Sequence, residues 1–426
     1  MQLSTRLILL LGIAVVAVGG CGCSGNSSVD TQMVSWTGPV NHEEIWGIVR
    51  LTVESSADED VSSVKFYHDL VDNDHLIGTA TSAIASAYKQ VWYTADVPNG
   101  EYAIYAVVDY ENGEFVQKSI TIEVGNRTRL EAIPTDAVKI TLETDDIPPL
   151  LNPDFSEYWH DPVPLEGPIN TAGGEDAPFI TYNGDFYFFF TPDVSVEPKD
   201  QGHDRVTGAY WSEKVNDEWT EPERVFLNYY DDVSLDGAQT ILGNTMWFGS
   251  VRAGNYREVD LYVAEFQDGI WTNWENAGEQ WNSAYDEDGY EVGELHVTAD
   301  GNQVYFHSER LGDTHSKGKY DIWVMEKVGG EWQEPENVEV VNTEGNESRP
   351  YVNDEGDELW YTGEYLGASA IYRSLKIDGE WQEAELIISQ FAAEPTLDSD
   401  GNIYFCHHFM QADNMVEADI YVCYRR

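Results

Sequence analysis

The chain has 426 residues and a formal net charge of −54, from 77 acidic against 23 basic side chains. Such a surface repels phosphate backbones and anionic membrane faces, which excludes nucleic acid as a partner. Because the acids are scattered along the chain, we interpret them as an adaptation to a salty exterior rather than as a dedicated ion-binding array. The length suits two or three domains.

The first twenty residues are predicted to be a secretion signal. Arg6 precedes an apolar run, Leu7–Val18, that is too short to span a bilayer comfortably. The run ends in Val18-Gly19-Gly20-Cys21, which resembles the lipobox of prokaryotic lipoproteins. This resemblance implies a lipoprotein signal peptide over residues 1–20 and lipidation at Cys21. An ordinary secreted protein is the alternative, and Cys23 is a rival acceptor.

Residues 21–33 are small and polar, and we expect them to form a flexible tether. The lipid would then be the protein's one contact with the membrane, and its location extracytoplasmic.

Residues 34–125 are predicted to form a small β-sandwich, because alternating apolar and polar residues recur between polar turns. The expected strands are 44–53, 63–69, 89–95, 101–110 and 115–124. Three short stretches of this segment resemble bacterial immunoglobulin-like modules. They are Val64-Lys65-Phe66-Tyr67, Leu76-Ile77-Gly78 and Val97-Pro98-Asn99-Gly100. That resemblance implies an immunoglobulin-like fold acting as a spacer or adhesive unit, and it implies no chemistry.

Residues 126–156 read as a proline-rich connector, in which we expect one edge strand at 137–142. The segment 157–170 has the form that precedes each later repeat. In propellers the last blade is often completed by a strand from the other end of the chain, and we expect this segment to supply it.

Residues 157–426 repeat one sequence motif, which is clearest from Asn342 to Trp381. The motif contains, in order, an Asn-Thr pair, a Glu, a Pro, an acidic turn, an aromatic strand and a Trp. Five copies are visible, with turn positions at Gly184, Asn244, Gly301, Gly356 and Gly401. Their spacing of 60, 57, 55 and 45 residues is in or above the range of propeller blades. The predicted fold class is therefore all-β, an immunoglobulin-like sandwich followed by a five-bladed propeller. A sixth blade would have to lie in the connector.

The repeats resemble the WD-type β-propeller repeats of TolB-like proteins. The matching residues are Asn342, Thr343, Glu347, Pro350 and Gly356, together with Asp321-Ile322-Trp323-Val324 and Asp419-Ile420-Tyr421-Val422. The resemblance covers residues 157–426 and implies a binding or scaffold role without fixing the ligand. The six blades and partner-binding domain of TolB are not recognisable here.

The first strand of each copy should line a central channel, so its side chains converge at one mouth. When the five copies are aligned on the turn, one position is occupied by Ala177, Gly237, Glu294, Arg349 and Glu394. The position before it includes Asp176 and Asp236. We expect Glu294, Arg349 and Glu394 to bind a ligand. The alternative is a glycoside hydrolase, by analogy with arabinanase-like propellers, with Asp176 as base, Asp236 tuning it and Glu294 as acid. Glu175 and Glu347 match a repeat-wide Glu that we interpret as structural.

The last copy contains Cys406, His407, His408 and Cys423. We expect a disulfide between Cys406 and Cys423 first, free buried thiols second and zinc third, since neighbouring strand residues point to opposite faces. The acidic turns 286–289 and 398–401 suggest calcium, but hairpin chemistry explains them better. We therefore expect no cofactor and no metal site.

These features together predict a lipid-anchored, extracytoplasmic binding or scaffold protein. Its ligand, a glycan or a surface protein, would be recognised at the channel mouth, with hydrolysis of a polysaccharide as the competing function.

Overall fold

The computed structural model describes residues 34–426 apart from 57–59, 280, 283–291, 310–314 and 413. The predicted signal peptide, the tether and Cys21 lie outside these residues. Among the described residues, no helix is long and apolar enough to cross a membrane. The chain divides into two compact units, and the larger contains everything from residue 121 onward together with 41–51 and 91–102.

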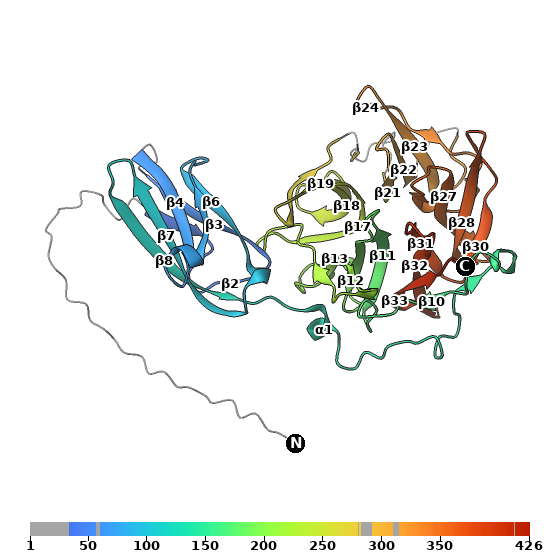
Figure 1. Ribbon diagram of the computed structural model, residues 1–426, viewed down its shortest axis with the longest axis horizontal. Coiled ribbons are helices and arrows are strands. Elements are labelled where there is room, and N and C mark those ends of the chain that lie inside the picture. Colours follow the sequence, from blue (N-terminus) through green and yellow to red (C-terminus); the bar gives the residue numbers. More distant parts are fainter. Residues whose placement is uncertain (1–33, 57–59, 280, 283–291, 310–314, 413) are drawn as a thin grey trace, which may run out of the picture. The chain divides into compact units, whose positions relative to one another are not determined.

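The N-terminal part is built from two sheets (Figure 1). A three-stranded sheet has the order β1 (Val34–Gly38), β3 (Ile48–Ser55), β6 (Ala87–Tyr93). A five-stranded sheet has the order β2 (Glu44–Ile45), β8 (Phe115–Val124), β7 (Gly100–Tyr110), β4 (Val61–His68), β5 (Leu76–Ala80). Alternate residues of β3 and β7 are buried, as the sequence pattern requires. The predicted β-sandwich is confirmed.

The rest of the chain forms a series of antiparallel meanders. The first contains β11 (Gly174–Ile180), β12 (Phe186–Thr191), β13 (Gly208–Ser212) and β16 (Glu223–Arg224). The second contains β17 (Ser234–Leu242), β18 (Thr245–Arg252), β19 (Asp260–Gln267) and β20 (Ile270–Asn276). Next come β21 (Leu295–Val297), β22 (Gln303–Ser308), β23 (Asp321–Val328) and β25 (Glu336–Asn337).

The later meanders borrow strands from the connector. One contains β26 (Ser348–Val352), β27 (Glu358–Tyr365), β28 (Ala368–Ile377) and β30 (Glu385–Ser389), with β9 (Leu150–Leu151) added at its outer edge. The last contains β31 (Ala392–Leu397), β32 (Ile403–Gln411) and β33 (Asn414–Cys423), with β10 (Val163–Pro164) paired to β33. Minor elements are β14 (Lys214–Val215), β15 (Glu218–Trp219), β24 (Glu331–Trp332), β29 (Glu380–Trp381), α1 (Arg129–Ala132) and α2 (Pro198–Gln201).

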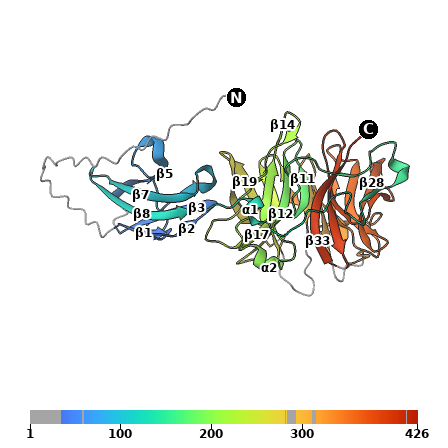
Figure 2. The ribbon, with the colours of Figure 1, turned by 90° about the horizontal axis from the view of Figure 1, so that it is seen from below.

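The meanders are arranged around a common axis, as Figures 1 and 2 show. Each inner strand contacts the next in the order β11, β17, β21, β26, β31, and β31 contacts β11. The propeller fold is thus confirmed. Because residues 283–291, which precede β21, lie outside the described ranges, the number of blades stays a prediction.

The Asn of the repeat motif forms hydrogen bonds that join one meander to the loop that follows it. Asn342 accepts a hydrogen bond from the backbone N–H of Ile322 at 2.7 Å and donates to its carbonyl at 2.9 Å. Asn170 makes the same pair of bonds to Ile420, at 2.9 and 2.8 Å. The segment expected to complete the propeller therefore does so through Asn170 and β10. The edge strand expected at 137–142 was wrong, because those residues form no strand and the connector instead pairs through β9.

The Glu of the repeat motif has a structural role, as predicted. Glu347 accepts from the Thr343 backbone N–H at 2.9 Å and from the Thr343 hydroxyl at 2.6 Å, and Glu175 accepts from Thr171 at the same two distances. Each carboxylate thereby satisfies backbone and hydroxyl donors where an inner strand begins.

Candidate functional site

Each of four inner strands carries a β-bulge at the same place. The register with the neighbouring strand shifts between 176 and 179, 237 and 240, 348 and 351, and 393 and 396. One residue in each bulge has a left-handed backbone, namely Ala177 (φ 47°), Ala238 (φ 53°), Arg349 (φ 51°) and Glu394 (φ 60°). Such a bulge redirects the side chain, at a cost of roughly 1 kcal/mol for a residue that is not glycine. In this way Arg349 and Glu394 leave the alternation of their strands.

Glu294, Arg349 and Glu394, the residues expected to bind a ligand, lie together. Arg349 Nε lies 2.8 Å from Glu294 Oε2 and also forms an ion pair with Glu394 Oε1. The Glu394 residue is only 5% exposed, and its Oε2 has no hydrogen-bond partner. Burial raises the pKa of Glu394 well above its ordinary value, although the positive charge of Arg349 lowers it. The negative charges of Asp176 and Glu294 raise this pKa further.

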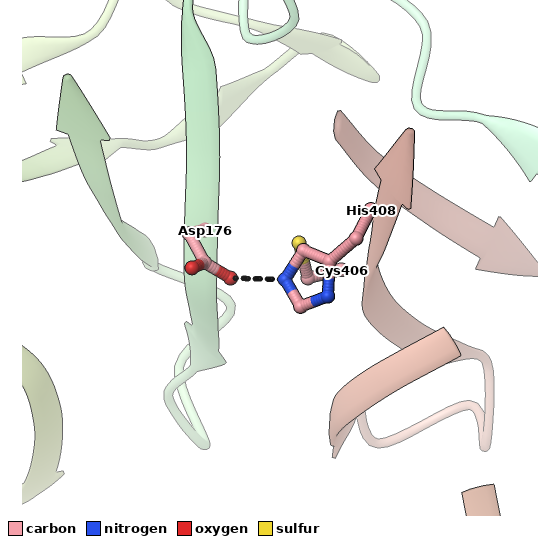
Figure 3. A group of neighbouring side chains, drawn as sticks. All are labelled: Asp176, Cys406 and His408. Carbon is pink, nitrogen blue, oxygen red and sulfur yellow. Dashed lines mark hydrogen bonds and ion pairs between the residues drawn. The ribbon is translucent and has the colours of Figure 1, made fainter. Parts of the chain in front are cut away.

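Asp176 lies beside two side chains of β32 (Figure 3). Its Oδ1 is 3.4 Å from His408 Nε2, and the donor atoms of Asp176, Cys406 and His408 all lie within 4.8 Å of one another. Burial alone would raise the pKa of Asp176, but the hydrogen bond and charge of His408 and the charge of Arg349 hold it below its ordinary range. Strand alternation places Cys406 and His408 on one face, whereas His407 points away and contacts Asp145 at 3.0 Å.

Asp236, suggested to tune the base in the hydrolase alternative, has its own set of partners. Asp236 accepts hydrogen bonds from the hydroxyls of Ser234 and Ser250, both at 2.6 Å, and forms an ion pair with Arg252. It is 4% exposed. Counted from the bulge, Asp236 is the equivalent of Glu175 and not of Asp176, because the hairpin after β17 is one residue shorter: Thr240 pairs with Trp247, whereas Phe179 pairs with Tyr187. Asp236 is thus a structural carboxylate.

The expected disulfide between Cys406 and Cys423 was wrong. Both cysteines are free and buried. In the pairing of β32 with β33, Cys406 lies opposite Ile420, while Cys423 lies opposite Ile403. The two cysteines are therefore offset by three residues along the strands, roughly 10 Å, which exceeds the reach of a disulfide.

Turn chemistry accounts for the described acidic turn. Asp398 Oδ1 accepts from the backbone N–H groups of Asp400 and Asn402, at 3.0 and 2.9 Å. The other acidic turn, 286–289, lies outside the described residues.

Two cavities lie along the inner strands and share Phe179, His296 and Tyr351 in their linings. The one beside Glu294, Arg349 and Glu394 has a volume of about 50 Å³. Where the inner strands run into their hairpins, a cavity of about 760 Å³ is lined with aromatic rings. The propeller contributes the rings of Phe179, Tyr182, Tyr187, Trp211, Phe226, Phe266, Trp271 and Tyr351, together with the imidazole of His296. Polar groups reach the same cavity from Asn183, Asp185, Glu213, Asn244, Asp354 and Ser399. No local signal in the sequence marks this cavity, because its lining comes from the hairpins of several meanders.

The comparison with protein families identifies the N-terminal module. Residues 33–106 match the family model described as a bacterial Ig domain. This module is a bacterial immunoglobulin domain. No curated protein matches the chain.

Several solved structures match this chain over part of its length. TolB from Acinetobacter baumannii is 10% identical, with 78% of this chain and 77% of that one covered and a TM-score of 0.35. A glycoside hydrolase is 13% identical, with 67% and 95% covered and a TM-score of 0.39. An endo-β-1,4-mannanase from Thermotoga petrophila is 20% identical, but the match spans only 22% of this chain and 20% of the enzyme, with a TM-score of 0.19.

Proposed function

We propose that this protein binds a neutral oligosaccharide in the aromatic cavity of its propeller, at the outer side of the cell membrane. The observation that carries the proposal is the cavity of about 760 Å³, lined by aromatic rings and ringed by polar groups. Sites for small ligands usually measure about 300 to 1,000 Å³ and combine apolar walls with a few polar groups.

The lining suits a sugar in particular. Sugar rings offer an apolar face of C–H groups to an aromatic ring, while their hydroxyls need donors and acceptors at the edge. Tyr182, 78% exposed, and Phe266, 39% exposed, are aromatic rings whose surfaces stay open to a ligand. Asn183, Asp185 and Asn244 could bond to hydroxyls. The net charge of −54 disfavours polyanionic glycans, so the expected ligand is uncharged.

The hydrolase alternative finds less support at the acidic end. A cavity of about 50 Å³ holds a few water molecules rather than a sugar ring. Glu294 and Glu394 are both bound to Arg349, and Asp236 is occupied by its own partners. Binding without turnover is therefore the function that we propose.

A glycan array probed with the detergent-solubilised full chain tests this proposal. We expect binding to neutral oligosaccharides without release of sugar. Replacing Tyr182 with Ala should weaken binding about tenfold, the effect of losing roughly 1.4 kcal/mol of ring contact. Tyr365→Ala is the matched control, because Tyr365 is 42% exposed but is not among the residues lining the cavity.

Three outcomes would contradict the proposal. One is equal loss of binding in the Tyr182 and Tyr365 variants. Another is sugar release by the wild type that disappears in Asp176→Asn. The third is binding to a surface protein and to no glycan.

The anchor is part of the same proposal. Replacing Cys21 with Ala should move the protein from the membrane fraction to the soluble fraction of its host, whereas Cys23→Ala should leave it in the membrane. The opposite pattern would assign the lipid to Cys23, and no change in either variant would contradict lipid anchoring.

A further inference from the structure

The first and last meanders of the propeller meet at three side chains with different donor atoms. Asp176 comes from β11, and Cys406 and His408 come from one face of β32. Their carboxylate oxygen, sulfur and ring nitrogen lie within 4.8 Å of one another. Figure 3 shows the Asp176 carboxylate and the His408 ring directed at each other, with the Cys406 sulfur beside them.

The spacing matches the edge of a small coordination shell. Zinc binds imidazole nitrogen and carboxylate oxygen at about 2.0 to 2.1 Å, so two such ligands in a tetrahedron lie about 3.3 Å apart. The separation between His408 Nε2 and Asp176 Oδ1 is 3.4 Å. An ion could therefore replace this hydrogen bond with little movement of either side chain. A mixed set of thiolate, imidazole and carboxylate favours zinc over the hard cations calcium and magnesium.

A buried, unpartnered carboxylate oxygen beside Asp176 is the independent observation. Glu394 is 95% removed from solvent, at 5% exposure, and its Oε2 has no hydrogen-bond partner. Buried carboxylate oxygens in native proteins nearly always have one. The Glu394 side chain lies against Asp176, and its neighbour Ala393 is the pairing partner of Cys406. Its other oxygen, Oε1, is bound to Arg349, which leaves Oε2 for a ligand.

The cluster is buried yet reachable. Cys406 is fully buried, while the side chains of His408 and Asp176 keep 19% and 28% of their surface exposed. An ion can therefore arrive from the solvent side of these two residues. The guanidinium of Arg349 opposes a cation here, but Glu294 and Glu394 both neutralise it.

We propose that Asp176, Cys406, His408 and Glu394 bind one zinc ion that ties β11 to β31 and β32. With four protein ligands the site is structural rather than catalytic. It goes beyond the sugar-binding function, since none of its four residues lines the aromatic cavity.

The test uses the full chain, stripped with a chelator and then exposed to zinc or cobalt with excess calcium to occupy surface acids. We expect about one tightly held zinc per chain and, with cobalt, the charge-transfer absorption of a metal–thiolate bond. Cys406→Ser should remove that absorption and weaken zinc binding at least about 100-fold, since even supporting residues around such sites are worth 10- to 100-fold. Cys423→Ser is the matched control, because it removes the other buried free cysteine.

His408→Gln keeps the proposal testable if Cys406→Ser fails to fold, because His408 is partly exposed. It should weaken zinc binding to a similar extent, and the zinc-dependent rise in the unfolding temperature of the wild type should vanish in it. The proposal is overturned if the stripped wild type takes up no tightly held zinc. It is equally overturned if the cobalt–thiolate absorption survives Cys406→Ser, or is lost in Cys423→Ser. Because sugar binding is measured separately at the aromatic cavity, either proposal can fail without the other.

Discussion

The side chain of Asn170 bonds to both backbone groups of Ile420, a residue 250 positions later in the chain. Within a meander, Asn342 makes the same contact with Ile322, only 20 positions earlier. The same pair of Asn hydrogen bonds therefore also joins the segment that precedes the propeller to the last meander.

Replacing Asn170 with Ala should destabilise the propeller by about 1 to 3 kcal/mol. The backbone N–H of Ile420, which is fully buried, would lose its acceptor, and an unsatisfied buried donor carries a cost of this size. The carbonyl of Ile420 would keep its bond from the Leu165 N–H. Chemical denaturation followed by tryptophan fluorescence measures the change. Asn112→Ala, in an exposed hairpin, is the control and should have little effect; equal losses in the two variants would contradict this account.

Replacing Asp236 with Asn should lower stability by about 3 to 5 kcal/mol and leave sugar binding unchanged in the protein that folds. The change removes the negative charge that pairs with the partly buried Arg252 guanidinium, and loss of the counter-charge in a largely buried ion pair leaves the remaining charge uncompensated. The double variant Asp236→Asn, Arg252→Met should recover part of the loss, since it removes that charge. Denaturation and glycan-binding measurements on the same samples check both points. Loss of binding with stability intact would return Asp236 to the functional site.

The stability of the propeller should fall with acid partly because of His296. Its ring lies 4.5 Å from that of Tyr351, between centroids, and burial lowers its pKa from 6.5 to about 4. Between these pH values the unfolded chain binds the proton and the folded protein does not. The contribution of His296 to the free energy of unfolding is therefore complete above pH 6.5. As the pH falls toward 4, about 3 kcal/mol of it is lost.

The variant His296→Phe isolates this effect, because it keeps an aromatic ring and removes the titration. Its stability should decline less steeply than that of the wild type between pH 6.5 and 4. His307, whose pKa burial lowers to about 3, contributes with the same sign in both proteins and cancels in the difference. Parallel stability curves would show that His296 does not titrate as proposed.

The fold was largely predictable because its signals are local. The Asn-Thr pair and the Glu four residues after the Thr recur in sequence, and the bonds of Thr343 to Glu347 show why, since they span only four residues. A strand with alternating apolar residues and a turn at Gly356, whose φ of 73° suits glycine, is also visible in the sequence.

The site was less predictable because it depends on bulges and on pairing between distant segments. The hairpin after β17 is one residue shorter than the hairpin after β11, so an alignment on the turn placed Asp236 beside Asp176. Cys406 and His408 are two positions apart and so share one face of a strand, but Asp176 lies more than 200 positions earlier, and nothing local joins them. The aromatic cavity is likewise assembled from the hairpins of several meanders.

The junction of β10 with β33 also constrains the time course of folding. Val163 and Pro164 have no partner strand until Val422 and Tyr421 have been synthesised, and contacts of such long sequence separation form slowly. Between those moments an apolar edge is open to other chains. A nascent chain that stalls within the last meander should therefore be the species most prone to aggregate, and the one that most needs a chaperone.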